Sequence, residues 1–159
     1  MHLLHAGKEE PMLSKLTFEQ ISKYWEVIEY AIENSLPPIT ETADNPEKMQ
    51  NILASLMNGS MQCWASYKRL EGGNKMEGIL VTTTTLDYCS GTKSLLLYSV
   101  YAYEKLEKSS WLEGFEAIGK YARSIGCHTI TAVSNSEDVI RAAKMVGGDA
   151  SYTLLVFKM

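Results

Sequence analysis

The chain has 159 residues, of which 45% are hydrophobic and 21% charged. These proportions are ordinary for a globular domain and exclude a wholly disordered chain. The length fits one domain around a single hydrophobic core. The formal net charge of −4 counts against a general nucleic-acid-coating function, because proteins of that class carry an excess of basic residues.

The cysteines and histidines form no pattern typical of a metal site. Cys63, Cys89 and Cys127 are widely spaced, and no Cys-x-x-Cys pair or matching histidine spacing accompanies them. The apolar runs have the length of strands and are too short to cross a bilayer, and the N-terminus lacks the layout of a signal peptide. We therefore expect no metal, no membrane segment and a cytoplasmic location.

The N-terminal region is expected to begin with a flexible arm over residues 1–15, followed by a single domain over 16–159. Thr17 and Gln20 have the spacing of a capping box, in which each side chain accepts a hydrogen bond from the other residue's backbone N–H. Apolar residues then recur three or four positions apart, which predicts a helix to about Asn34.

A second helix is predicted after the dipeptide Pro37-Pro38, which ends the first helix and opens a polar loop. Asn45 is a suitable N-cap, and Pro46 is suitable for the first helical position. The glycine at position 59 is expected to end this helix, because glycine readily adopts the left-handed conformation found there.

The middle of the chain changes to the alternating pattern of strands. Three strands are predicted over 61–69, 76–86 and 94–103, and the run Thr82–Thr85 is rich in β-branched residues. Short polar segments containing glycine separate the strands and predict hairpin turns. This region is therefore expected to form a three-stranded antiparallel meander.

Helix and strand signals alternate after the meander. Ser110 and Glu113 have the spacing of a second capping box, opening a helix that Gly126 closes. A short apolar strand is predicted over 128–133. Helix, strand, helix and strand therefore follow the meander in turn.

The last two predicted elements are a helix and a strand. Ser136 is a suitable N-cap, Gly147-Gly148 ends the helix, and residues 151–159 are predicted to form the final strand. The predicted fold class is α+β, with a mixed, mostly antiparallel sheet flanked by helices.

This order of elements resembles the GCN5-related N-acetyltransferase (GNAT) superfamily. The best-matched stretch is Lys-Tyr-Ala-Arg-Ser-Ile-Gly-Cys-His-Thr-Ile over 120–130, which is similar to the family's central helix and its Ala-Arg-x-x-Gly-Cys turn into the next strand. Asn135 and the Lys-Met-Val-Gly sequence over 144–147 extend the match. The resemblance covers roughly residues 61–159 and implies a GNAT-like fold.

A second stretch, Leu-Asp-Tyr-Cys-Ser-Gly-Thr-Lys-Ser-Leu over 86–95, is similar to GNAT-like proteins of bacteriophages. This resemblance implies a phage-encoded protein, located in the host cytoplasm or in the virion. It also implies another phage protein as one expected partner.

The family resemblance implies transfer of an acetyl group from acetyl-CoA to an amine of a small molecule or a protein. In this family the donor lies between the strands that correspond to 95–103 and 128–133, with its pyrophosphate on amides at the start of the central helix. The cofactor-binding residues that the resemblance implies are Val100, Tyr101, Ala102, Lys108, Ser109, Ser110, Trp111 and Asn135. The start of any helix favours anions, since its first N–H groups have no partner within the helix.

The phosphate-binding loop departs from the family's pattern. The family places glycines where the backbone approaches phosphate, whereas the corresponding positions here are Ser109, Ser110 and Trp111. Two interpretations remain open. Either the indole crowds the pyrophosphate, or Trp111 packs into the core and the loop is rebuilt.

The catalytic residues also depart from the family's pattern. The tyrosine that commonly protonates the CoA thiolate corresponds to Ala143, which cannot donate a proton. Tyr98 and Tyr101 are candidate replacements, and Glu104 is a candidate base at the end of its strand. Each has a structural alternative, namely packing for the tyrosines and a solvated carboxylate for Glu104.

Two functional hypotheses follow. The first is an acetyl-CoA-dependent N-acyltransferase with altered signature residues. The second is a catalytically inactive binding or structural protein on the same scaffold, associated with a phage or virion. In either case, the apolar residues over 152–157 suggest a homodimer formed through an exposed sheet edge.

Overall fold

The computed structural model describes residues 10–40 and 45–159, which form a five-stranded sheet with helices on both faces. The strands lie in the sheet in the same order as in the chain. Neighbouring strands from β1 to β4 pair antiparallel, and β5 pairs parallel to β4. The elements in chain order are β1 (Glu10–Lys15), α1 (Phe18–Lys23), α2 (Trp25–Glu33), α3 (Lys48–Met57), β2 (Met61–Leu70), β3 (Gly73–Leu86), β4 (Lys93–Ala102), α4 (Lys108–Ser124), β5 (Cys127–Ala132) and α5 (Glu137–Met145). The predicted α+β class with a mixed, mostly antiparallel sheet is confirmed.

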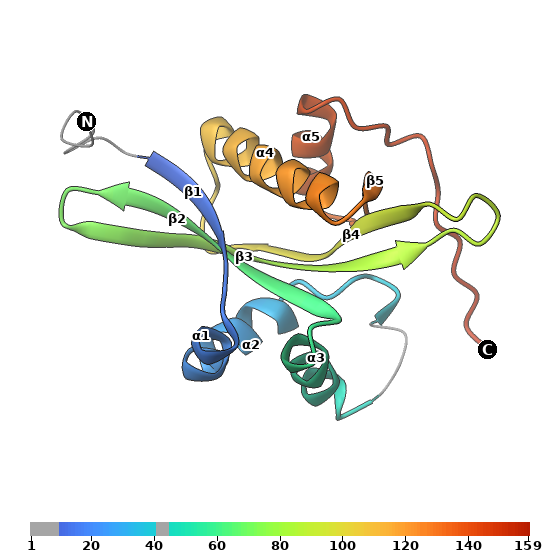
Figure 1. The fold of residues 1–159 in the computed structure, drawn as a ribbon, viewed down its shortest axis with the longest axis horizontal. Coiled ribbons are helices and arrows are strands. Elements are labelled where there is room, and N and C mark those ends of the chain that lie inside the picture. The colour runs from blue at the N-terminus through green and yellow to red at the C-terminus, as the bar shows by residue number, and fades with distance from the viewer. Residues whose placement is uncertain (1–9, 41–44) are drawn as a thin grey trace.

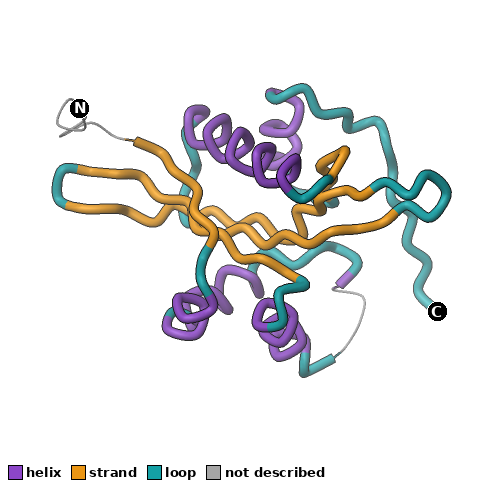
Figure 2. The backbone as a smooth tube through the Cα atoms, viewed as in Figure 1, coloured by secondary structure: helices purple, strands orange, loops and turns teal. Residues whose placement is uncertain are grey.

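The helices cover the sheet in two layers, with α1, α2 and α3 below it and α4 and α5 above it in Figure 1. The tube in Figure 2 shows the same arrangement, with the long strands β2 and β3 crossing the molecule between the layers. Alternation along β2 explains why both faces need cover. Cys63 and Ala65 pack toward α1–α3, whereas Trp64 between them packs toward α4.

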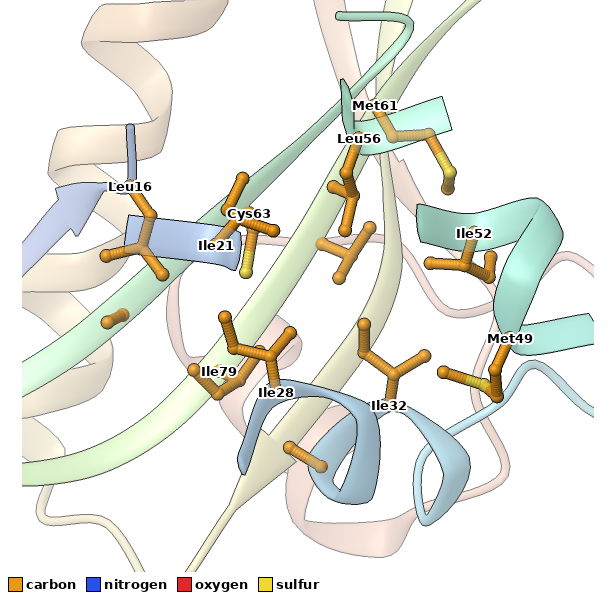
Figure 3. Close-up of a cluster of buried hydrophobic side chains, with 13 residues drawn as sticks. Leu16, Ile21, Ile28, Ile32, Met49, Ile52, Leu56, Met61, Cys63 and Ile79 are labelled. Carbon is orange, nitrogen blue, oxygen red and sulfur yellow. The ribbon is translucent and has the colours of Figure 1, made fainter. Parts of the chain in front are cut away.

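The larger core lies between the sheet and the three N-terminal helices (Figure 3). Its helical contribution comes from residues spaced three or four apart, which places them on one side of each helix. Burial raises the pKa of the Cys63 thiol to about 12, so this cysteine serves here as a small apolar side chain. The buried members are Leu16, Ile21, Ile28, Ala31, Ile32, Met49, Ile52, Leu56, Met61, Cys63, Ala65, Ile79 and Val81.

The smaller core lies on the other face, between the sheet and α4. Trp64 is buried there, its indole N–H donates to Thr82 Oγ1 over 3.0 Å, and its ring meets Tyr121 of α4 edge to face at 4.9 Å. The other buried members are Leu80, Leu95, Ile118, Ala122 and Cys127. This packing fixes the position of α4 relative to β4.

The N-terminal predictions are partly confirmed. The Thr17–Gln20 capping box is present, with hydrogen bonds of 2.9 and 3.2 Å. The single helix predicted to Asn34 is instead two helices that meet at Tyr24. A flexible arm over 1–15 is wrong for Glu10–Lys15, which forms β1 and pairs along β2. The rest of that arm, residues 1–9, lies outside the described residues, as do 41–44 of the polar loop.

Two C-terminal predictions are wrong. The first is the Ser110 capping box. Helix α4 begins at Lys108 with Glu107 as N-cap, because the Ser110 hydroxyl donates to Glu77 on β3 instead of capping the helix. The second is the final strand, since residues 151–159 have no strand conformation.

The remaining helices match their predictions in part. The prediction of Asn45 as N-cap and Pro46 as the first helical residue is wrong, because the N-cap of α3 is Glu47. Asn45 accepts a hydrogen bond from the Glu47 backbone N–H over 2.9 Å, although α3 begins at Lys48. Ser136 caps α5 through the N–H of Val139. None of the helices within the described residues combines the length and apolar character needed to cross a membrane.

Candidate functional site

The separation of β4 from β5 creates the candidate site. Parallel pairing between these strands runs to Leu97 opposite Ala132, which is its last matched pair. One residue further along β4, the antiparallel pairing with β3 is irregular. Leu97 lies opposite Thr82, whereas Ser99 lies opposite the adjacent residue Val81, so two neighbours on β3 pair with residues two apart on β4. Tyr98 is therefore an extra residue, and such a bulge bends its strand and increases its twist. Beyond this point β4 continues without β5 beside it.

A cavity of about 440 Å³ lies where β4 meets α4 and α5. This volume is within the range of small-molecule sites in proteins, roughly 300–1,000 Å³. The cavity is lined by Val100, Ala102, Glu104, Lys105, Leu106, Lys108, Trp111, Ser136, Asp138, Val139, Arg141, Ala142 and Met145. Its lining thus comes from β4, from the start of α4 with the loop before it, and from α5 along its whole length.

The first turn of α4 presents backbone donors at this cavity. The first backbone hydrogen bonds of the helix come from the N–H groups of Ser110 and Trp111 to the Glu107 carbonyl, at 3.1 and 3.3 Å. The N–H groups of Lys108 and Ser109 precede them and lie outside the helical ladder. Together with the helix dipole, such groups favour a bound anion.

A buried carboxylate holds the start of α4 against the sheet. Glu77 on β3 is only 5% exposed, and its two oxygens accept from the Ser110 hydroxyl over 2.9 and 3.2 Å. Lys68 of β2 lies 3.7 Å from Glu77 and 3.1 Å from Glu107. A buried charge is stable only when it is paired and hydrogen-bonded. This network therefore fixes the first turn of α4 relative to β2 and β3.

The interactions among Lys68, Glu77 and Ser110 could not be predicted from the sequence. Lys68, Glu77 and Ser110 are far apart in the chain, and a lone glutamate within a strand gives no signal of burial. Its neighbour Gly78 shows how tightly the strands pack there, since a Cβ at that position would stand 2.4 Å from the Tyr101 carbonyl oxygen. Only glycine fits this close approach.

Basic side chains of the cavity come from two elements. Lys105 lies in the loop before α4, Lys108 is the first residue of α4, and Arg141 comes from α5. The Arg141 guanidinium donates to Asp138 over 2.8 Å, which partly neutralises it. The two lysines thus provide positive charge beside the free amides, an arrangement suited to phosphate groups.

The predicted cofactor-binding residues divide into two groups. Val100, Ala102, Lys108 and Trp111 line the cavity. The remaining predicted residues, Tyr101, Ser109, Ser110 and Asn135, are not among its lining residues, and the Ser110 hydroxyl is directed to Glu77. Trp111 is half-buried at the cavity wall, so the indole contributes to the site's shape.

Glu104 lines the cavity, but its environment makes it a weak base. Its carboxylate forms a salt bridge with Lys75. The hydrogen bond from Lys75, followed by the charge of that lysine, lowers the pKa of Glu104. A carboxylate whose charged form is stabilised in this way accepts a proton less readily.

The candidate tyrosines face the opposite side of the sheet from the cavity. Tyr98 and Tyr101 pack against the larger core, under α1–α3. Tyr101 meets Tyr30 of α2 and Tyr103 edge to face, at 6.1 and 5.0 Å between ring centroids. Partial burial is the larger cause that raises the pKa of Tyr101, and the nearby Tyr30 raises it further. The phenol of Tyr101 therefore stays protonated at neutral pH.

Helix α5 contributes more to the cavity than the sequence predicted. Ser136, Val139, Arg141 and Met145 line it, although sequence reasoning selected only Asn135 from this region. Ala142, one position before Ala143, is also a lining residue. The side chains around the described cavity therefore include no tyrosine. The amphipathic spacing of α5 is a local signal that this helix buries one face, but it does not indicate which element that face meets.

Comparison with known proteins supports the fold. No protein-family model matches the sequence, and the search of curated proteins finds no match. Solved structures do match. The acetyltransferase AAC(6')-Iy, in complex with the bisubstrate analogue CoA-S-monomethyl-acetylneamine, is similar with a TM-score of 0.67 at 9% identity, over 94% of this chain and 98% of that one.

Two further solved structures are similar over nearly their whole length. Ribosomal-protein-alanine N-acetyltransferase from Brucella melitensis has a TM-score of 0.64 at 8% identity, over 94% of this chain and 99% of that one. A GNAT family acetyltransferase from Staphylococcus aureus has a TM-score of 0.58 at 10% identity, over 94% and 98% of the two chains. The chain thus has a GNAT-like fold, although its sequence identity to these structures is very low.

Proposed function

We propose that this protein is an N-acyltransferase that moves an acetyl group from acetyl-CoA to an amine. One observation carries the proposal. The cavity lies where β4 and β5 have separated, with the first turn of α4 and two lysines beside it. The similar structures include AAC(6')-Iy with a CoA-containing bisubstrate analogue, which supports the same ligand class here.

The residues of the site fit the chemistry of the donor. Acetyl-CoA would supply a thioester whose carbonyl carbon an amine can attack. Lys105, Lys108 and the first amides of α4 would bind its phosphate groups. Val100 and Ala102 would line its path along β4, where the outer edge of the strand is free of β5. Positioning both reactants is then the main contribution of the protein.

Proton transfer has few candidates at this cavity. Glu104 is held ionised by Lys75, and Asp138 is paired with Arg141. We therefore expect the acceptor to arrive as the neutral amine, with its proton leaving to water. Such an enzyme depends on orientation rather than on a strong base, which predicts a rate that rises with the neutral fraction of the acceptor amine.

Calorimetric titration with acetyl-CoA, together with an assay of free CoA thiol in the presence of amines, tests this function. The acceptors are a diamine, an aminoglycoside and a peptide with a free N-terminus. We expect acetyl-CoA binding, and thiol release that depends on at least one of these acceptors. Absence of both binding and release at millimolar acetyl-CoA would exclude the proposed function.

A second candidate function is a binding protein without catalysis. It is favoured by the side chains around the cavity, where alanine occupies the region of the expected proton donor and the Ser110 hydroxyl is engaged by Glu77. Binding of acetyl-CoA and of CoA with equal affinity, with no thiol release for any acceptor, would favour this candidate over the enzyme.

Partners and location form part of the same proposal. The acceptor class is an amine on a small molecule or protein, in keeping with the names of the similar acetyltransferases. A cytoplasmic location is proposed from the sequence pattern, and association with a phage protein or virion from the sequence resemblance. A second copy of the chain is also proposed as a partner, since the C-terminal residues expose apolar side chains.

A further inference from the structure

Glu107 is an acidic residue at a position where it can compete with a bound phosphate group. It is the N-cap of α4, yet its side chain makes no capping hydrogen bond. A carboxylate at an N-cap is attracted to the first N–H groups of the helix and to the helix dipole, as a phosphate is. The natural destination of this carboxylate is therefore the same group of amides that the proposed function assigns to acetyl-CoA.

Lys68 of β2 holds the Glu107 carboxylate elsewhere. The Lys68 Nζ lies 3.1 Å from Glu107 Oε1. The residues on both sides of Glu107, namely Leu106 and Lys108, line the cavity, whereas Glu107 and Lys68 are not among its lining residues. The side chain of Glu107 is thus directed to β2, although its backbone lies at the edge of the cavity.

The position of Lys68 is itself fixed by the buried carboxylate of Glu77. Glu77 is an extra residue between Met76 and Gly78, at a bulge in the pairing of β3 with β2. Its carboxylate lies 3.7 Å from Lys68 Nζ, and the side chain of Lys68 is only 13% exposed. An ammonium group buried against one carboxylate has little freedom to move, so it can hold a second carboxylate in a defined place.

Other acidic residues at the cavity are also engaged by basic partners. Salt bridges involve Glu104 on one side of the cavity and Asp138 on another. By contrast, Lys105 and Lys108 form no ion pair with another residue of the described chain. Pairing of the acids therefore leaves these two lysines available to a phosphate group, and Glu107 would neutralise one of them if it turned toward the cavity.

We propose that Lys68 is a positioning residue for the donor, because it holds the Glu107 carboxylate against β2 and so keeps the first amides of α4 open to phosphate. The inference rests on the proposed function, in which those amides bind acetyl-CoA. Without the charge of Lys68, the Glu107 carboxylate moves onto the start of α4 and competes with the donor. Lys68 thus controls affinity from outside the cavity.

The first test is calorimetric titration of Lys68→Gln with acetyl-CoA. This change removes the charge but keeps an amide that can donate to Glu77. We expect the affinity to fall about tenfold, and to return to within about twofold of the wild type when Lys68→Gln is combined with Glu107→Gln. The single variant Glu107→Gln is the matched control and should also bind within about twofold of the wild type.

Thermal unfolding of the same proteins separates affinity from stability. We expect Tm to fall equally in Lys68→Gln and in the double variant, since both leave Glu77 without its ammonium partner. Recovery of affinity without recovery of Tm is the result that a purely structural role of Lys68 does not give. A double variant that binds as weakly as Lys68→Gln would overturn the proposal.

The second test is Glu107→Asp, which keeps the negative charge and the intact Lys68. Aspartate is a strong N-cap residue, and its shorter side chain is expected to accept from the N–H of Ser109 or Ser110 instead of reaching Lys68. We expect about tenfold weaker binding of acetyl-CoA, with Tm unchanged or higher. The side chain at position 107 is 61% exposed, so this variant folds even if Lys68→Gln does not. Wild-type affinity in Glu107→Asp would contradict the inference.

Titration with inorganic pyrophosphate distinguishes failure of this inference from failure of the proposed function. Equal binding of acetyl-CoA by the wild type, Lys68→Gln and Glu107→Asp refutes the inference alone. Binding of pyrophosphate but not of acetyl-CoA by the wild type refutes the function alone if both variants weaken it, and refutes both proposals if they do not. Binding of neither anion overturns both.

Discussion

Glu77 is the residue on which the geometry of the site depends most directly. Its carboxylate is buried on β3, and it receives the Ser110 hydroxyl from α4 and lies near Lys68 from β2. Removing the Glu77 carboxylate leaves the buried Ser110 hydroxyl without its acceptor and leaves Lys68 paired with Glu107 alone, which costs more than the interaction itself contributes.

Glu77→Ala is therefore expected to lower the free energy of unfolding by about 3–5 kcal/mol. For a chain of this length each kcal/mol corresponds to roughly 2–4 °C, so Tm should fall by at least about 6 °C. Thermal and urea unfolding measure both quantities. Glu104→Ala is the control, because that carboxylate is exposed, and its Tm should change little. Equal effects of the two substitutions would contradict the role assigned to Glu77.

Glu104 gives a prediction about pH. Its pKa lies below the ordinary value because Lys75 hydrogen-bonds to the charged form. The salt bridge is thus fully present above the ordinary pKa of a glutamate and is lost only as the pH falls through the lower folded-state value. At neutral pH and above, Glu104 stays ionised, so no change of activity with pH in that range should come from this carboxylate.

We expect Glu104→Gln to leave the pH profile of kcat/KM unchanged between pH 6 and 9, conditions under which the acceptor amine dominates the profile. The measurement is initial-rate thiol release with one acceptor across that range. Loss of an acidic limb, or a large fall in kcat in Glu104→Gln, would instead assign Glu104 the role of general base.

At the scale of elements, the start of α4 carries the proposed affinity for phosphate. Lys108 lies in its first turn and lines the cavity, whereas Lys120 lies nearer the other end of the same helix and is 73% exposed. The two lysines thus form a matched pair for a charge-reversal experiment within one helix.

Lys108→Glu is expected to weaken acetyl-CoA binding by about tenfold, because it replaces attraction for phosphate by repulsion at close range. Lys120→Glu should leave the affinity within about twofold. Calorimetry at low and high salt measures both, and the difference should shrink as salt screens the charges. An equal loss of affinity in both variants would show that the net charge of the protein matters and that the start of α4 does not.

The elements also show what sequence could and could not predict. Helices with a regular apolar stripe, such as α3 and α5, and strands with many β-branched residues, such as β3, were predictable because their signals are local. The start of α4 was not, because the partner of Ser110 is 33 positions away. Residues 151–159 have the composition of a strand, but a strand also needs a neighbour, and the sequence names none.

At the scale of the whole molecule, the sheet separates two layers of helices with different roles, one in packing and one in the proposed ligand site. The α1–α3 face holds the larger core and the tyrosines of β4. The α4–α5 face holds the cavity. The cavity was predictable only in part. Resemblance indicated β4 and α4, whereas the contribution of α5 depends on how that helix packs against β4, which no local pattern encodes.

The central claim is that acetyl-CoA binds between β4, the first turn of α4 and helix α5. Titration of ¹⁵N-labelled protein with CoA, followed by amide NMR shifts, tests it most directly. We expect the largest shifts at Val100, Ala102, Lys108 and Ser109, with small shifts on the tyrosine-bearing helix α2. Saturable shifts centred elsewhere, or no shifts at millimolar CoA, would contradict it.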